Sequence, residues 1–439
     1  MVLEAHTQIQ YCTAKANYCE FHAGLRHLMR LARWAGFFPV QGLSQTNPDD
    51  VRFEFRSLYA LYHAITVIGQ TVMTFLAFYS FVDSNVSLSV VSNFLFYFTN
   101  YVTLVLLWRL SKNWSALISK TLEFEQSVTE IRTTRNLVSR TNTLTYVVLI
   151  FAMIEHALSK VFNIRSVMCC LGETSLNHTV INNYFKFKWK FVFDYFSTST
   201  TYSYFVGFIA EFLCMQATFL WSFTDVLIMC FSIYLSSFFE DFNSTVSSFM
   251  KKASKTVPWS TLRVQYSQIV LIVKQMDEQL DYFVLISYFT NLFFICFQLY
   301  NSLNRIYDAN DVCNENMDII ATASVTYLTY YVFSFLFLVT RALLLSIMAA
   351  NVHSCAQVPQ LALYEVPTAD YSLDVQRFQL QLRYTTVGLS GVCFNVTRGM
   401  ILRVIGTIVT YELVLIQLTK KNLDNDTSIR DYYLPKHLI

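Results

Sequence analysis

The nine residues 410–418, TYELVLIQL, decide the fold class of this chain because they close the last of seven long apolar segments. They place two polar side chains, Glu412 and Gln417, inside a run that otherwise requires lipid or protein around it. Polar groups at such depth are rare, and they are stabilised by water or by polar partners on another helix. The stretch therefore predicts a membrane helix with access to water.

The rest of the chain has the composition of a polytopic membrane protein. Of its 439 residues, 54% are hydrophobic and only 14% are charged, a balance that a water-soluble globule of this size could hardly cover. A helix needs about twenty mostly apolar residues to cross a bilayer. Seven windows meet this requirement, at residues 57–80, 86–108, 144–165, 203–238, 279–303, 319–350 and 399–418. We expect an all-α membrane protein with seven transmembrane helices.

Charge and motif content exclude several other classes. The net charge of +2 offers no basic track, so no nucleic-acid partner is expected. The chain has no phosphate-binding glycine loop, no nucleophile elbow and no His-Glu-x-x-His helix. We therefore expect no enzyme activity, no cofactor and no metal. Lys and Arg are spread almost evenly over the two predicted sides of the membrane, so charge alone does not set the orientation.

Two segments outside the windows are predicted to be amphipathic helices. Between Thr261 and Met276, apolar residues recur at helical spacing and lead directly into the fifth window. Ser372 can cap another helix, with Asp374 in its first turn. Their apolar faces pack either on each other within one subunit or between subunits.

An ordered set of motifs resembles the sugar-sensing branch of the insect gustatory receptors. TYELVLIQL is similar to the Thr-Tyr-four-apolar-Gln-Phe signature that ends these receptors, although Leu418 stands where the signature has Phe. Five further stretches resemble the same family in order along the chain: FFPVQG (37–42), MIEHALS (153–159), WSFTD (221–225), NLFFICFQL (291–299) and FNVTR (394–398).

This resemblance implies a sugar-gated, nonselective cation channel in the plasma membrane of gustatory sensory neurons. It implies a cytoplasmic N-terminus, an extracellular C-terminus, and assembly as a homotetramer or as a heterotetramer with related receptors. The partners are then a sugar, membrane lipids and permeating cations. The domains expected on this basis are a cytoplasmic segment (1–56), six helices with the ligand-binding bundle (57–350), a cytoplasmic anchor (351–398), a pore-lining helix (399–418) and an extracellular tail (419–439).

A sugar site combines carboxylates, amides and hydroxyls with an aromatic face that packs on the C–H surface of the ring. Spans three to six carry ten candidates for one outward-opening pocket: Glu155, His156, Glu211, Trp221, Asp225, Asn291, Gln298, Thr326, Tyr327 and Tyr330. Structural alternatives remain open. Asp225 could instead form a buried ion pair with Arg341, and Trp221 could be ordinary core packing.

The last window carries the pore candidates. Thr410, Leu413 and Gln417 share one helical face, and Leu418 lies on the neighbouring face. In a symmetric ring these residues would give alternating apolar and amide rings around a central axis. Alternatively, Gln417 bonds a neighbouring helix, and Glu412 contacts another helix or subunit.

Two further questions stay open. A G-protein-coupled or other non-channel receptor is the alternative function, but all six prolines lie outside the windows, whereas that class typically has prolines in its later helices. Cys313 could form a disulfide with Cys169 or Cys170, which are also placed outside the membrane.

Overall fold

The fold is known from a computed structural model of the chain. The structure describes residues 18–45, 50–83, 87–129, 136–196, 204–251, 257–307 and 317–411, together with positions 414 and 417. For residues 303–307 and 317–327 only the backbone is described.

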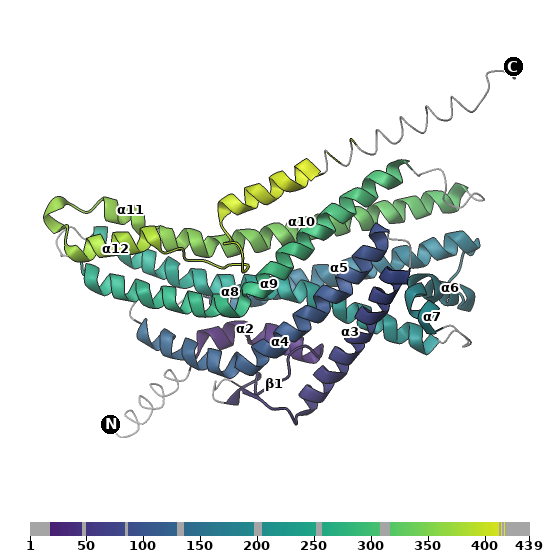
Figure 1. The fold of residues 1–439 in the computed structure, drawn as a ribbon, viewed down its shortest axis with the longest axis horizontal. Coiled ribbons are helices and arrows are strands. Elements are labelled where there is room, and N and C mark those ends of the chain that lie inside the picture. The colour runs from purple at the N-terminus through teal and green to yellow at the C-terminus, as the bar shows by residue number, and fades with distance from the viewer. Residues whose placement is uncertain are drawn as a thin grey trace, which may run out of the picture.

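The described chain is an elongated bundle of long helices (Figure 1). In chain order its elements are α2 (Glu20–Trp34), β1 (Val40–Gln41), β2 (Arg52–Phe53), α3 (Leu58–Asp83), α4 (Leu88–Ser127), α5 (Leu137–Leu171), α6 (His178–Lys188), α7 (Lys190–Phe196), α8 (Tyr204–Lys251), α9 (Trp259–Tyr307), α10 (Met317–Gln357), α11 (Pro359–Tyr364), the 3-10 turn η2 (Thr368–Asp370) and α12 (Leu373–Tyr384). Helices α6 and α7 lie at one end of the bundle, and α11 and α12 lie at the other.

Six of these helices are long and apolar enough to cross a membrane, among the residues that the structure describes. They are α3, α4, α5, α8, α9 and α10, and they coincide with the first six predicted windows, three of which begin one or two residues before their helix. The predicted all-α class is therefore confirmed, with one two-stranded antiparallel sheet, β1–β2, beside it. Strand β1 of that sheet lies in the FFPVQG stretch. At the end of this stretch, a Cβ on Gly42 would lie 2.0 Å from the Asp50 carbonyl oxygen, so only glycine fits.

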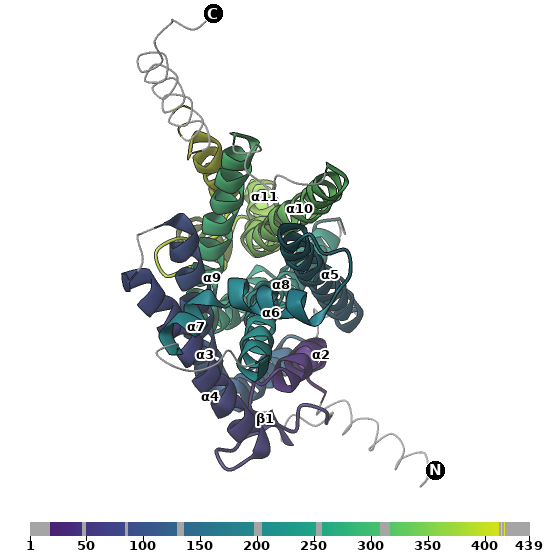
Figure 2. The same cartoon turned by 90° about the vertical axis from the view of Figure 1, so that its right-hand side faces the viewer.

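Helix α8 forms the centre of the bundle (Figure 2). In its apolar window 83% of the residues are buried, against 17% for α5 and 33% for α3. The outer helices therefore expose apolar side chains that a soluble protein would cover, including Ile65 and Ile150, at 59% and 56% exposure. This distribution suits a bundle whose outer surface contacts lipid.

Both predicted amphipathic helices are confirmed. Helix α9 begins at Trp259, and the apolar residues of its first turns, such as Tyr266, are buried. The Ser372 hydroxyl oxygen accepts a hydrogen bond from the Val375 amide and caps α12. The rings of Tyr266 and Phe378 meet edge to face with centroids 5.2 Å apart, so the two apolar faces pack on each other within one chain.

The N-terminal helix α2 is held in the bundle by a half-buried acid on α4. The Glu125 carboxylate accepts hydrogen bonds from the backbone amides of Glu20 (2.7 Å) and Phe21 (2.9 Å) and from the Tyr234 hydroxyl (2.9 Å). A carboxylate at a helix N-terminus stabilises the helix dipole. One turn in, burial lowers the pKa of His22, whose Nε2 lies 3.1 Å from the Gln45 carbonyl oxygen.

A short connector joins α12 to the last helix. Residues Ser390 and Asn395 form an antiparallel bridge, and the Val396 amide donates to the Leu389 carbonyl oxygen at 2.9 Å. A helix then begins at Arg398 and continues to residue 411, with 414 and 417 also helical. It extends along the outside of the bundle, in yellow in Figure 1. The described residues do not include Glu412, Leu413, Leu418 or Cys313. The end of the seventh span and the disulfide of Cys313 therefore stay predictions.

Candidate functional site

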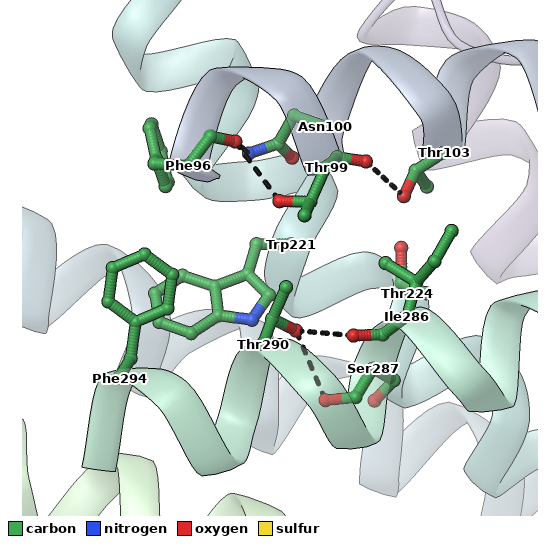
Figure 3. Close-up of a pocket in the computed structure, with 10 residues that line it drawn as sticks. All are labelled: Phe96, Thr99, Asn100, Thr103, Trp221, Thr224, Ile286, Ser287, Thr290 and Phe294. Atoms are coloured by element: carbon green, nitrogen blue, oxygen red, sulfur yellow. Dashed lines mark hydrogen bonds between the residues drawn. The ribbon is translucent and has the colours of Figure 1, made fainter. Parts of the chain in front are cut away.

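A cavity lies between α4, α8 and α9, about half-way along their apolar windows (Figure 3). It is lined by Phe96, Thr99, Asn100, Thr103, Trp221, Thr224, Ile286, Ser287, Thr290 and Phe294. About 290 Å³ in and around it is free of atoms, open solvent included, but only about 10 Å³ can hold the centre of a water molecule. The cavity is therefore narrow, with room for about one water molecule.

Aromatic rings form one side of this cavity and hydroxyl groups form the other. The rings of Trp221 and Phe294 lie 4.8 Å apart. The hydroxyls of Thr99, Thr224 and Thr290 donate to carbonyl oxygens of their own helices at 2.7 to 2.9 Å. Because those protons are already donated, the oxygens offer acceptor lone pairs to the cavity.

A buried ion pair lies next to Trp221. Arg341 Nε of α10 is 2.9 Å from Asp225 Oδ2 of α8, and the two side chains are 3% and 0% exposed. The Asn291 amide donates to the same Asp225 oxygen at 3.2 Å, and Ser287 donates to the other oxygen. Arg341 Nη1 also donates to Ser222 Oγ at 2.7 Å. The ion pair left open by the sequence is therefore formed.

Trp221 and Ser287 connect this network to the cavity, because both line the cavity and both contact the ion pair. The Arg341 guanidinium lies over the indole ring, with its Cζ 4.5 Å from the ring centroid, which is a cation–π geometry. The indole Nε1 is buried and has no hydrogen-bond partner. A ligand entering the cavity would thus meet a ring that also contacts a buried cation.

A second polar chain connects α5, α9 and α10. The Ser334 hydroxyl donates to Glu155 Oε1 at 2.8 Å, and Gln298 Nε2 donates to Ser334 Oγ at 3.1 Å. Ser334 and Arg341 are two turns apart on α10, so they share a face. Five predicted residues, Glu155, Trp221, Asp225, Asn291 and Gln298, therefore belong to two polar groups organised by α10.

Glu211 lies apart from these groups, nearer the α6–α7 end. It forms ion pairs with Lys160 and Lys188, and the Trp189 indole donates to its Oε2 at 3.2 Å. Its carboxylate oxygens are thus occupied by the protein in this state. Lys188 could not be identified from the sequence, because the pairing depends on how α6 folds over α8.

The other predicted ligand residues are less closely grouped. Tyr330 stacks on Phe162 with centroids 5.4 Å apart, and His156 is half-buried on α5. The side chains of Thr326 and Tyr327 lie outside the described residues. A ligand role for all ten residues stays a prediction.

Helix α4 lines the cavity with residues that were not predicted from the sequence. Thr99, Asn100 and Thr103 recur at helical spacing in an apolar window, a pattern that could have indicated a polar face. The pattern is weak on its own, because Ser and Thr are tolerated in membrane helices when they bond to their own backbone.

The last helix leaves its apolar side chains uncovered in the single chain. Met400 and Ile401 pack on the core, whereas Leu402 is 72% and Val409 53% exposed. Thr410 and Gln417, two of the predicted pore residues, are exposed as well. Their side chains are therefore available to surroundings outside this chain.

Comparisons with known proteins agree on one family. The trehalose receptor family model matches residues 11–427. The chain is 28% identical to the gustatory receptor for sugar taste 64f of Drosophila melanogaster, over 92% of this chain and 81% of that one. It is 25% identical to gustatory receptor 5a for trehalose of the same organism, over 90% and 85%.

A solved structure supports the fold. The insect olfactory receptor OR5 from Machilis hrabei, in complex with eugenol, superposes with a TM-score of 0.58 over 90% of this chain and 97% of that one, at 12% identity. At that identity the likeness concerns the fold alone. The relatives are chemosensory receptors and not enzymes. Because the family model covers nearly its whole length, this chain belongs to the trehalose receptor family of insect gustatory receptors and has the insect chemoreceptor fold.

Proposed function

We propose that this receptor is a saccharide-gated, nonselective cation channel of the plasma membrane of gustatory sensory neurons. Its family and its fold make it a gustatory sugar-receptor relative with a chemoreceptor bundle. The ligand, the gate and the permeating ion are the parts proposed here. The domain roles expected from the sequence form part of the same proposal.

The observation that carries the proposal is the chemistry of the cavity lining. Hydroxyl oxygens whose protons are already donated line one side, and the Trp221 and Phe294 rings line the other. Such a lining suits a neutral ligand that brings many O–H donors and has an apolar C–H face. Saccharides have both properties. A charged ligand would find no opposite charge among the lining residues.

The narrow cavity suggests how binding is linked to a conformational change. A saccharide is larger than a space of about 10 Å³, so α4, α8 and α9 must separate, or Trp221 must turn. A turn of Trp221 changes its contact with Arg341. A ligand that binds only the opened arrangement shifts the population toward it.

Helix α9 is well placed to transmit this change to the last helix. It carries Ser287 and Thr290 in the cavity lining, and it carries Asp277 about three turns earlier. The Asp277 carboxylate accepts from the Ser390 amide (2.6 Å) and from the Ser390 hydroxyl (2.7 Å). The connector that precedes the last helix is therefore tied directly to α9.

Assembly around a common axis would cover the last helix. In the single chain, Thr410, Gln417 and several apolar residues of this helix are exposed. The apolar residues require contact with lipid or protein, and the two polar residues require contact with water or polar groups. We propose that copies of this helix, in a homotetramer or with related receptors, line a hydrated pore.

The test is current through excised patches from cells that express the full chain, recorded without nucleotides. Sugar-evoked cation current is expected, whereas a receptor that acts only through a G protein would give none. Within the cavity, F96L and T99V each remove a ligand contact. We expect each to raise the half-maximal sugar concentration about 3- to 10-fold, since a net contact contributes about 1 kcal/mol.

Phe98 supplies the matched control. It lies two residues from Phe96 on the same helix but is 42% exposed and does not line the cavity. F98L should keep the sugar response of the parent. Equal responses of F96L, T99V and the parent at equal surface expression would place the ligand elsewhere, with Glu211 and His156 as the next residues to change.

A further inference from the structure

A second, larger opening lies between α5, α8 and α10, at the end of the bundle that carries α12. About 1310 Å³ in and around it is free of atoms, open solvent included, and about 710 Å³ can hold the centres of water molecules. The corresponding space in the candidate ligand cavity is only about 10 Å³. This groove can therefore accept a sizeable group without rearrangement.

The groove has the same polarity gradient on all three helices. On α5, Ser139 and Arg140 precede Leu144, which begins the apolar window. On α8, Ser236 lies one turn beyond Ile233, and on α10 the apolar Ile347 is followed one turn later by Asn351. On each helix the polar residue lies toward the membrane boundary and the apolar residue toward the membrane interior.

The polar part of the groove carries a positive charge. Arg140 is exposed, and no acidic residue lines the groove. Within the described part of the chain, no carboxylate forms an ion pair with Arg140. A guanidinium presents a planar set of donors that matches a phosphate.

The apolar part of the groove continues into the outer surface of the bundle. Next to it, Val147 on α5 and Ile347 on α10 line the groove and are 48% and 57% exposed. Ile150, one turn further along α5, is also exposed. Acyl chains could leave the groove along this surface, which suits contact with lipid.

We propose that this groove binds one anionic phospholipid, with the phosphate on Arg140 and the acyl chains along α5 and α10. In the proposed orientation the lipid comes from the cytoplasmic leaflet, which is rich in anionic lipids. The occupant bridges α5 and α10, and α10 also carries Ser334 and Arg341 of the candidate site. The proposal requires membrane insertion but no sugar response.

The test counts lipids that stay bound to the purified full chain in native mass spectrometry. The protein is exchanged into vesicle lipid of phosphatidylcholine with or without phosphatidylserine or phosphatidylinositol bisphosphate. The parent should retain the anionic lipids and not the neutral one. R140Q should lower retention about tenfold, as expected for a lost charge-assisted contact.

Arg109 provides the control, because it is an exposed arginine near the same membrane boundary on α4 that does not line the groove. R109Q should retain lipid as the parent does. A second variant, S139D, sets a negative charge beside Arg140 at an exposed position and should also lower retention, which keeps the test valid if R140Q folds poorly.

Three outcomes would overturn the proposal. They are equal retention by R140Q, S139D and the parent, an equal loss in R109Q, or binding of inorganic phosphate as tight as that of the phospholipid. The last result would assign the groove to a free anion. None of them bears on the sugar-evoked current, so the two proposals fail separately.

Discussion

At the residue scale, Arg341 organises more of the site than any residue chosen from the sequence. It pairs with Asp225, donates to Ser222 and lies over Trp221. The sequence identified Trp221, Asp225 and Asn291 as candidates, because polar groups in apolar helices stand out. It could not decide between an ion pair and a ligand contact, since that choice depends on the rotation of α10 against α8.

The buried pair gives a stability prediction. D225N leaves the Arg341 guanidinium buried without a counterion, and removing one partner of such a pair costs about 3 to 5 kcal/mol. We expect a clear drop in the melting temperature of the purified protein. The double variant D225N/R341M should lose less than the sum of its single variants, because no charge is then left unpaired.

Measurement is by thermal unfolding in detergent, followed by size-exclusion chromatography. Lys120, on the exposed side of α4, supplies a control in K120M, which should melt like the parent. Additive losses in the double variant would mean that Asp225 and Arg341 do not interact in the folded protein.

At the scale of elements, apolar windows located the helices but not their ends. Helix α4 runs to Ser127 and α8 to Lys251, well beyond the predicted windows ending at 108 and 238. Hydropathy detects the segment within lipid, and a helix that continues into water becomes amphipathic and loses that signal. Helices α2, α6 and α7 were not predicted for the same reason. The extension of α9 was predicted because its apolar spacing continued from the window.

The connector between α12 and the last helix gives the prediction at this scale. D277A removes both acceptors of Ser390 and weakens the link between the connector and α9, where the Tyr288 and Phe394 rings still meet. We expect the maximal sugar-evoked current to fall about tenfold at equal surface expression, since two contacts to a charged group are lost. Ion selectivity should stay unchanged, because the proposed pore helix itself is intact.

The control for this change is E278A. Glu278 is the next residue along α9, it is exposed, and its removal changes the charge equally. Patch recordings at saturating sugar compare the two variants. A maximal current in D277A equal to that in E278A would show that the connector does not carry the signal.

At the scale of the whole molecule, the single chain leaves much of its last helix exposed. The core is built around α8, and the outer surfaces of α3 and α5 suit lipid. In the last helix, Met400 and Ile401 pack on the bundle near the start, whereas Thr410 and Gln417 are exposed beside apolar residues. Polar side chains that faced lipid would be costly. A water-filled axis shared between copies satisfies both kinds of residue.

Gln417 tests that arrangement. In Q417E an isosteric side chain adds one negative charge per copy, so a shared axis gains a ring of carboxylates that attracts cations. We expect a higher permeability for divalent cations and a sugar dose response within about twofold of the parent, since the ligand cavity lies elsewhere. Reversal potentials in bi-ionic solutions measure the first effect. The matched variant V414E puts the same charge on the neighbouring face and should change permeability less. A Q417E channel with unchanged ion preference but altered sugar potency would remove this face from the pore.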